Sequence, residues 1–322
     1  MNRYLLALSL AGGLLAGCRK ADLVECDPSP ESVYPDTVLR DFARRNGVPT
    51  QTFTVSSAAP STSVQTVRTA AGATIAFAPA SLLLPNGAAA TGPLQLRVRE
   101  IYTVPDMLLS NMPTQTAWGR RLLVSGGEFS IQFWQNDTRL RLTSTARVTV
   151  TSPQPADAGS NQLLWQQPAR LTGTDSAGWL LASRDSVRIL APGGQPQYQV
   201  PIPLDSVSWW NIDRLWSLYG SSGTVTLTVR APVIALNRTS STWMFLRPVG
   251  YNGLLKVYPS GSTNEWSGTL PGGAAMKAAV LQAVNGQLYY GVQAFTTQNN
   301  LAVAPTLTAV SEAQAVQLIR QL

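Results

Sequence analysis

Histidine is absent from all 322 residues of this sequence. Its absence excludes Ser-His-Asp and Cys-His catalytic sites, His-Glu-x-x-His zinc sites and acid–base catalysis by imidazole. Cysteine is nearly absent, with only Cys18 and Cys26, which is too few for a thiolate metal cluster. Phosphate-loop, dinucleotide-binding and calcium-loop motifs are also missing. The sequence therefore predicts a non-catalytic protein without a metal or cofactor.

Charged residues are scarce as well. They make up 13% of the chain, against roughly 25% in an average soluble domain. The formal net charge is +7, but the arginines are scattered and no nucleic-acid-binding module accompanies them. We therefore expect no nucleic-acid partner. Uncharged polar residues fill the difference, as is typical of a β protein outside the cytoplasm.

The N-terminus has the three parts of an export signal. Arg3 is followed by an apolar run from Tyr4 to Leu15, which is shorter than the roughly 20 residues that span a bilayer. The run ends in Leu15-Ala16-Gly17-Cys18, which resembles the lipobox of bacterial lipoproteins. That resemblance implies a signal peptide over residues 1–17, cleaved so that a lipid-modified Cys18 becomes the first residue.

The lipobox also implies a partner and a location. Acyl chains on Cys18 would hold the protein in a lipid bilayer, since two or more chains give stable anchoring. No Asp follows the cysteine, and Arg19 and Lys20 stand there instead. This resembles lipoproteins of the outer membrane, facing the periplasm or the cell surface. With Cys18 acylated, Cys26 has no partner for an internal disulfide.

Two short helices are expected, one near each end of the chain. Residues 18–48 form a lipidated tether. It contains a short helix from Thr37 to Asn46, and Gly47 ends that helix. The second helix follows Ser311 as its cap. Its apolar residues are expected on one face, and they are Ala315, Leu318, Ile319 and Leu322.

Between these helices the hydrophobic pattern has a period of two. Apolar residues alternate with polar ones in four runs, which predict strands with one buried face. The runs are residues 94–99, 128–133, 148–151 and 225–229. No helical pattern separates the strands, so the predicted fold class is all-β, with two antiparallel β-sandwich domains in tandem. We expect the first over residues 49–153, a tryptophan-bearing connecting region over 154–219, and the second over 220–322.

Two blocks of sequence resemble known proteins. The first runs from Gly72-Ala73-Thr74-Ile75-Ala76-Phe77 to Leu123-Val124-Ser125-Gly126-Gly127-Glu128, and the second is Trp209-Trp210-Asn211-Ile212-Asp213-Arg214-Leu215. Together they resemble a group of envelope lipoproteins from Bacteroidetes, although those relatives often carry Cys where this chain has Ile212. The first block is also similar to the β-sandwich domain of ankyrins and netrin receptors. The resemblance implies a fold and an envelope location, and no catalytic residues.

The candidate ligand-binding residues are Trp209, Trp210, Trp216 and Asp213. An exposed indole beside an acid can stack on a sugar ring, so a glycan-binding surface is one interpretation. The alternative, which we favour, is that these tryptophans plug the ends of packed sheets, while Asp213 and Arg214 satisfy a turn. A hydrolase would need two converging carboxylates, and the nearest pair in the sequence is Asp205 with Asp213.

Glu100 interrupts the alternation of the strand that precedes it. It falls on the apolar side of Leu94, Leu96 and Val98. Either a β-bulge shifts it to the other face, or it is a buried acid paired with an arginine. A bulge is preferred because Ile101 would then restore the pattern.

For function, the sequence predicts an anchored envelope protein that acts as a scaffold or binds a protein partner, with glycan binding as the alternative.

Overall fold

The structure is a computed structural model. It describes residues 37–56, 63–155, 159–167, 178–183, 187–203, 209–217, 223–230, 240–259 and 265–322. The expected signal peptide and five further residues discussed above lie outside these ranges: Cys18, Arg19, Lys20, Cys26 and Asp205. In the described part of the chain, none of the helices has the length and apolar character needed to cross a bilayer.

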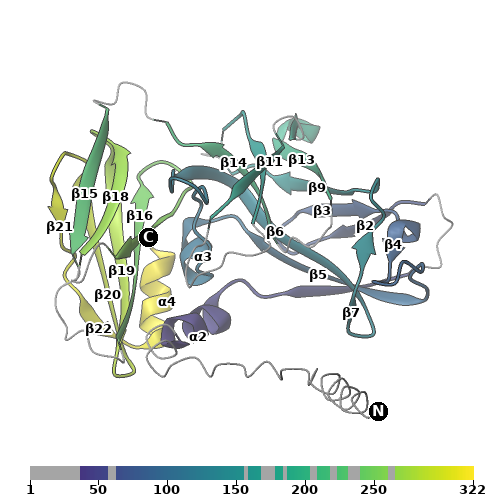
Figure 1. The fold of residues 1–322 in the computed structure, drawn as a ribbon, viewed down its shortest axis with the longest axis horizontal. Helices are drawn as coiled ribbons and strands as arrows, with labels where there is room; N and C mark the ends of the chain where they lie inside the picture. The colour runs from purple at the N-terminus through teal and green to yellow at the C-terminus, as the bar shows by residue number, and fades with distance from the viewer. Residues whose placement is uncertain are drawn as a thin grey trace, which may run out of the picture.

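The first lobe is a sandwich of two antiparallel sheets (Figure 1). In spatial order, the first sheet contains β1 (Gln51–Ser56), β5 (Pro93–Ile101), β6 (Leu123–Gln135), β14 (Trp210–Leu215), β10 (Leu163–Gln166) and β11 (Leu180–Ser183), with β7 (Thr138–Arg139) paired to β6. The second sheet contains β12 (Arg188–Leu190), β13 (Gln197–Ile202), β9 (Val148–Pro153), β3 (Thr74–Phe77) and β2 (Gln65–Arg68). A small pair, β4 (Leu82–Leu83) and β8 (Arg141–Leu142), lies beside them, and the short 3-10 helices are η1 (Pro79–Ser81) and η2 (Pro192–Gly194).

The second lobe is built on one eight-stranded sheet. Its spatial order is β21 (Ala302–Val303), β15 (Thr224–Arg230), β18 (Glu265–Pro271), β17 (Leu255–Pro259), β16 (Ser240–Pro248), β19 (Ala275–Val284), β20 (Gln287–Thr296) and β22 (Thr308–Val310). Neighbouring strands are antiparallel, apart from the parallel pair β15 and β21. Side chains of β15 and β18 share a core with side chains of β16 and β19. The sheet therefore folds over on itself into two layers.

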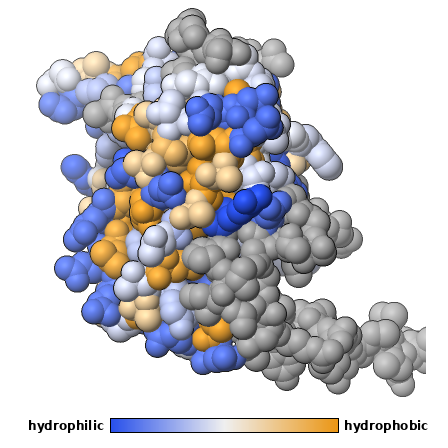
Figure 2. All heavy atoms as spheres, turned by 90° about the vertical axis from the view of Figure 1, so that its left-hand side faces the viewer, coloured by the Kyte–Doolittle hydropathy of each residue, from blue (hydrophilic) through white to orange (hydrophobic). Residues whose placement is uncertain are grey.

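The strands follow the alternation read from the sequence. In β5, the side chains of Leu94, Leu96 and Val98 are buried. Val225, Leu227 and Val229 are likewise buried in β15. The all-β fold class is confirmed. At the outer side of the second lobe, apolar side chains gather along the middle of the face, with polar ones around them (Figure 2).

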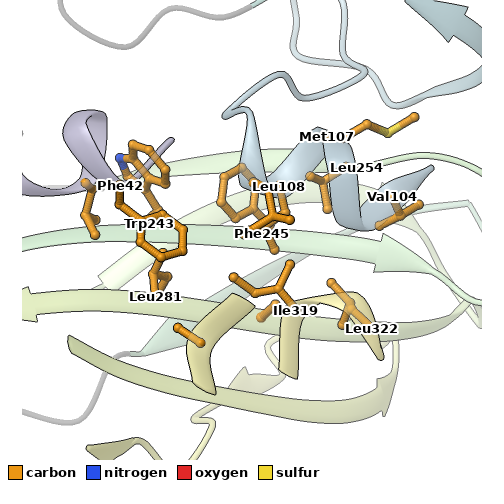
Figure 3. Close-up of a cluster of buried hydrophobic side chains, with 14 of the residues drawn as sticks. Phe42, Val104, Met107, Leu108, Trp243, Phe245, Leu254, Leu281, Ile319 and Leu322 are labelled. Atoms are coloured by element: carbon orange, nitrogen blue, oxygen red, sulfur yellow. The ribbon is translucent and has the colours of Figure 1, made fainter. Parts of the chain in front are cut away.

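Three α-helices form a layer between the lobes: α2 (Thr37–Asn46), α3 (Val104–Leu109) and α4 (Glu312–Arg320). Their apolar side chains pack on Trp243, Phe245 and Leu281 of the second lobe (Figure 3). These side chains are Leu39, Phe42, Val104, Met107, Leu108, Ala315 and Ile319.

Both expected helices are present, with one error in each interpretation. Leu39 and Phe42 of α2 are fully buried, so this helix is part of the folded body, whereas the sequence placed it in a tether. In α4, Ala315 and Ile319 are buried, but Leu318 is 39% exposed. The apolar stripe that meets the sheet is therefore narrower than predicted.

The strands of residues 154–219 belong to the first lobe. β10, β11 and β14 extend its first sheet, and β12 and β13 extend its second. The sequence analysis assigned these residues to a separate connecting region. Alternation along a strand shows that one face is buried, but it does not identify the neighbouring strand. That neighbour is set by pairings distant in sequence, such as β14 with β6.

Candidate functional site

The three candidate tryptophans are all buried. Trp209 is 8% exposed, Trp210 is 1% exposed and Trp216 is 7% exposed. Each packs in a different core: Trp210 inside the first sandwich, Trp209 in the helical layer, and Trp216 in the core of the second lobe. The prediction of core plugs is therefore correct, and the prediction of an exposed stacking platform is wrong. Sheet geometry explains part of this, because adjacent residues on a strand face opposite ways.

Asp213 is also buried, and it is not in a turn. It lies inside β14, with an exposed fraction of 0%. Its Oδ2 accepts a hydrogen bond of 2.6 Å from Nδ2 of Asn211. Ser125 Oγ donates to Oδ1 of the same Asn211 (3.1 Å). Its proposed partner, Asp205, lies outside the described residues.

The acid that accompanies Asp213 is Glu128, which the sequence analysis did not select. In the sheet, Glu128 of β6 lies opposite Asn211 of β14, and Asp213 lies opposite Ser125. Residues opposite one another in antiparallel strands share a face. Glu128, Asn211 and Asp213 therefore lie on one face, and the neighbouring Phe129 and Ile212 point into the sandwich core.

Burial dominates the electrostatics of this pair. Desolvation raises the pKa of Glu128 well above its usual range, and the nearby Asp213 raises it further. Burial also raises the pKa of Asp213, although the nearby polar groups of Ser125, Asn211 and the Gly126 backbone oppose that rise. Both carboxylate oxygens of Glu128, and Oδ1 of Asp213, have no hydrogen-bond partner among the described residues. The arrangement therefore favours the neutral acid at Glu128.

Two glycines make this arrangement possible. The pairing of β6 with β14 shifts register at Ser125–Gly127, so that Gly126 is an extra residue in β6. A Cβ at Gly126 would lie 2.6 Å from Cε2 of Tyr198. Gly127 has a φ of +138°, which disfavours residues with a side chain. The Gly126-Gly127-Glu128 motif is the one sequence signal that could have indicated this site.

Glu100 is a second buried acid, and it is fully hydrogen-bonded. Its exposed fraction is 6%. It accepts hydrogen bonds from four groups, which are Gln51 Nε2 (3.1 Å), Thr69 Oγ1 (2.9 Å), Ala71 N (3.1 Å) and Tyr102 Oη (3.3 Å). The predicted bulge is wrong, because β5 pairs with β1 and β6 in unbroken register. The alternative of an arginine partner is wrong as well, since the four donors are neutral.

The open sites of the molecule lie away from these acids. A cavity of about 500 Å³ beside β7 and β8 is lined by Arg139, Arg141 and Arg147. A cavity of about 310 Å³ in the second lobe is lined by Arg120 and Lys256. Next to Arg120 in the chain, Trp118 is 79% exposed. The sequence analysis selected neither Arg120 nor Trp118.

The two acids of this site are closed off from solvent. Glu128 and Asp213 are enclosed by protein, so neither can act on a substrate that arrives from solvent without rearrangement. Among the residues that the structure describes, no group of three or more acidic or cysteine side chains could hold a metal ion. No protein-family model matches the chain, and no curated protein matches it either.

Proposed function

We propose that this protein is a lipid-anchored, non-catalytic lipoprotein of the bacterial outer membrane that serves as a scaffold or binds a protein partner. One observation carries the proposal. The sequence Leu15-Ala16-Gly17-Cys18 follows a short apolar run and has small residues where a signal peptidase must accommodate the chain. A cysteine in this position is the acceptor for acyl chains.

The packing of α2 in the folded body supports this proposal. This helix follows the proposed lipid attachment site in the chain, and its Phe42 is buried against the second lobe. Arg45 of α2 donates to Glu312 of α4 through Nε (2.9 Å) and Nη2 (2.7 Å). The chain that follows the proposed attachment site therefore enters the folded body at α2. Such an attachment would present both lobes to a partner in a fixed relative orientation.

Two other functions have less support. Glycan binding through Trp209, Trp210 or Trp216 requires an exposed indole, and all three are buried. A hydrolase requires two carboxylates facing a cleft, whereas Glu128 and Asp213 are enclosed. The resemblance to Bacteroidetes envelope lipoproteins agrees with an anchored protein that has no catalytic site.

Acylation can be tested directly. In a bacterial host supplied with a clickable palmitate analogue, the full chain should incorporate label and sediment with outer membranes. Cys18→Ser should lose the label and move to the soluble fraction. Cys26→Ser is the matched control and should keep both properties. Label that persists in Cys18→Ser, or disappears only in Cys26→Ser, would contradict the proposal.

Partner binding needs a separate experiment. The lipidated protein would be cross-linked in intact cells, extracted in mild detergent and purified through a C-terminal tag. A defined envelope protein should be recovered in a fixed ratio with the wild type and be lost with the soluble Cys18→Ser variant. Recovery of no envelope protein above an untagged control would refute the scaffold role, while leaving the lipid anchor unaffected.

A further inference from the structure

A tight turn between α3 and β6 brings one arginine to the edge of the second lobe. Gly119 has a φ of +72° and Arg120 has a φ of +46°. The turn is closed by hydrogen bonds between Thr116 and Arg121: Thr116 N donates to Arg121 O (2.9 Å), and Arg121 N donates to Thr116 Oγ1 (2.9 Å). A left-handed conformation is unfavourable for a side chain such as arginine. An arginine in this backbone conformation therefore points to a structural or functional role for its side chain.

The guanidinium of Arg120 is held over an aromatic ring. Its Cζ lies 4.0 Å from the centre of the Tyr258 ring, which is a cation–π geometry. Within the part of the chain that the structure describes, no acceptor or acid engages this guanidinium besides the ring. Its planar set of N–H donors therefore stays available for a ligand, and such a set matches a carboxylate in two parallel hydrogen bonds.

The cavity beside Arg120 is polar and free of acids among its described lining residues. Lys256 adds a second positive charge, and its Nζ lies 5.0 Å from the centre of the Trp243 ring. Three residues that carry hydroxyl groups also line the cavity, and they are Thr226, Ser267 and Thr269. Thr226 lies directly opposite Thr269 in the β15–β18 pair. Two cations and a row of hydroxyls fit a ligand that carries one negative charge and several hydroxyl groups.

An exposed aromatic residue stands in the chain between two residues that line this cavity. Ala117 and Gly119 both line it, and Trp118 between them has 79% of its surface exposed. A large aromatic side chain so exposed is uncommon, and it is a typical surface for stacking on the apolar face of a sugar ring. At about 310 Å³, the cavity is at the small end of the range of about 300–1,000 Å³ seen for ligand sites. That size fits one ring.

We infer that this cavity binds an acidic sugar, a hexuronate or the uronate unit of a polysaccharide. Arg120 takes the carboxylate, the hydroxyls of Thr226, Ser267 and Thr269 bind the ring hydroxyls, and Trp118 covers the ring face. Lys256, whose Nζ donates to Asn111 Oδ1 (3.2 Å), adds positive charge to the lining. This site is separate from the lipid anchor and from protein scaffolding, so the two proposals stand or fall independently.

Isothermal titration and tryptophan fluorescence of the full protein can test the site. Oligogalacturonate should bind and alter the fluorescence, neutral oligosaccharides should bind at least about tenfold more weakly, and inorganic phosphate should not compete. Arg120→Gly should weaken oligogalacturonate binding about tenfold or more, because it removes the charged hydrogen bonds. Glycine suits the positive φ, so this variant keeps the turn and the fold. Trp118→Ala should also weaken binding and remove most of the fluorescence change.

Arg121→Ala is the matched control, since Arg121 is an exposed neighbour that does not line the cavity. It should bind as the wild type does. Three results would overturn the inference: no binding of any uronate, equal binding of neutral sugars, or unchanged affinity in Arg120→Gly. Equally tight binding of phosphate would also overturn it, because the site would then recognise an anion without a sugar ring.

Discussion

Glu100 and Glu128 are both buried acids, but their carboxyl groups differ in the hydrogen bonds that they accept. Both are almost fully buried, and they lie on neighbouring strands, β5 and β6. Glu100 accepts four hydrogen bonds, which replace the water that it loses on folding. Glu128 accepts none from the described residues. An unpaired buried carboxylate is costly, so Glu128 is favoured in its neutral form.

The Glu128 side chain is expected to reduce stability as pH rises. Burial raises its pKa above the unfolded value, near 4.5. The folded protein then holds a proton that the unfolded chain releases, so the free energy of unfolding falls as pH rises above that value. In Glu128→Gln this loss should be smaller. At pH 8 the variant should be more stable than the wild type by at least about 1 kcal/mol. Urea unfolding between pH 4 and pH 8 measures this.

The matched control for that experiment is Glu265→Gln. Glu265 is partly exposed and pairs with Arg230 on the surface, where ion pairs contribute little. Its stability curve should follow that of the wild type across the pH range. Part of the wild-type slope should remain in Glu128→Gln, because burial also raises the pKa of Asp213. A Glu128→Gln variant less stable than the wild type at pH 8 would contradict the neutral-acid interpretation.

Among the secondary-structure elements, α2 and α4 act as a pair that closes the layer between the lobes. The N-terminus of α4 carries a capping box, in which Ser311 Oγ accepts from Gln314 N (3.2 Å) and Gln314 Oε1 accepts from Ser311 N (2.8 Å). Arg45 of α2 binds Glu312 at the same end. The hydrogen bonds from Arg45 lower the pKa of Glu312. This contact should therefore weaken as pH falls through the lowered pKa.

Among the residues of α2, Phe42 is expected to contribute most to the free energy of unfolding. Its ring is fully buried against the second lobe, and removing such a side chain costs about 3–5 kcal/mol. Phe42→Ala should lower the free energy of unfolding by that amount, as measured by urea titration. Arg44→Ala on the exposed side of the same helix should change it by less than about 0.5 kcal/mol. Equal effects of the two variants would mean that α2 is not docked.

At the scale of the whole molecule, the lobes are joined by hydrogen bonds to backbone atoms as well as by the helices. The loop between β16 and β17 reaches the first lobe, where Asn252 Nδ2 donates to Ser125 O (2.9 Å) and to Tyr102 O (2.9 Å). Ser125 N donates in return to Asn252 O (2.7 Å). Thr114 N also donates to Leu254 O (2.8 Å). We expect the two lobes to unfold together because this contact is so extensive.

Gly253 provides a test of that coupling. A Cβ there would lie 2.5 Å from Leu123 O, a backbone atom of the other lobe that cannot move aside cheaply. Wild-type protein should give one calorimetric transition, with equal calorimetric and van't Hoff enthalpies. Gly253→Ala should split it in two or lower its midpoint by several degrees. Gly268→Ala should keep one transition, because its Cβ would lie 3.1 Å from a Val257 methyl that can shift and otherwise at ordinary contact distances from Leu246 and Leu255.

The sequence by itself determined the class of fold. Alternation predicted the strands of β5, β6, β9 and β15, and capping residues predicted α2 and α4. These features depend on local geometry: side chains on a strand alternate between faces, and a helix needs a cap at its first turn. The Asn285-Gly286 turn between β19 and β20 is predictable for the same reason, since both residues take a positive φ.

Only the tertiary structure decided which buried face meets which partner. Trp209, Trp210 and Trp216 are close in sequence, yet they pack in three different cores. Glu128 meets Asp213 because β6 pairs with β14, a neighbour distant in the chain. Trp118 is exposed in a turn whose residues Ala117 and Gly119 line a cavity with residues of β15 and β18. Periodicity shows that a side chain is covered, but the covering element follows from long-range pairing, and no local pattern encodes that.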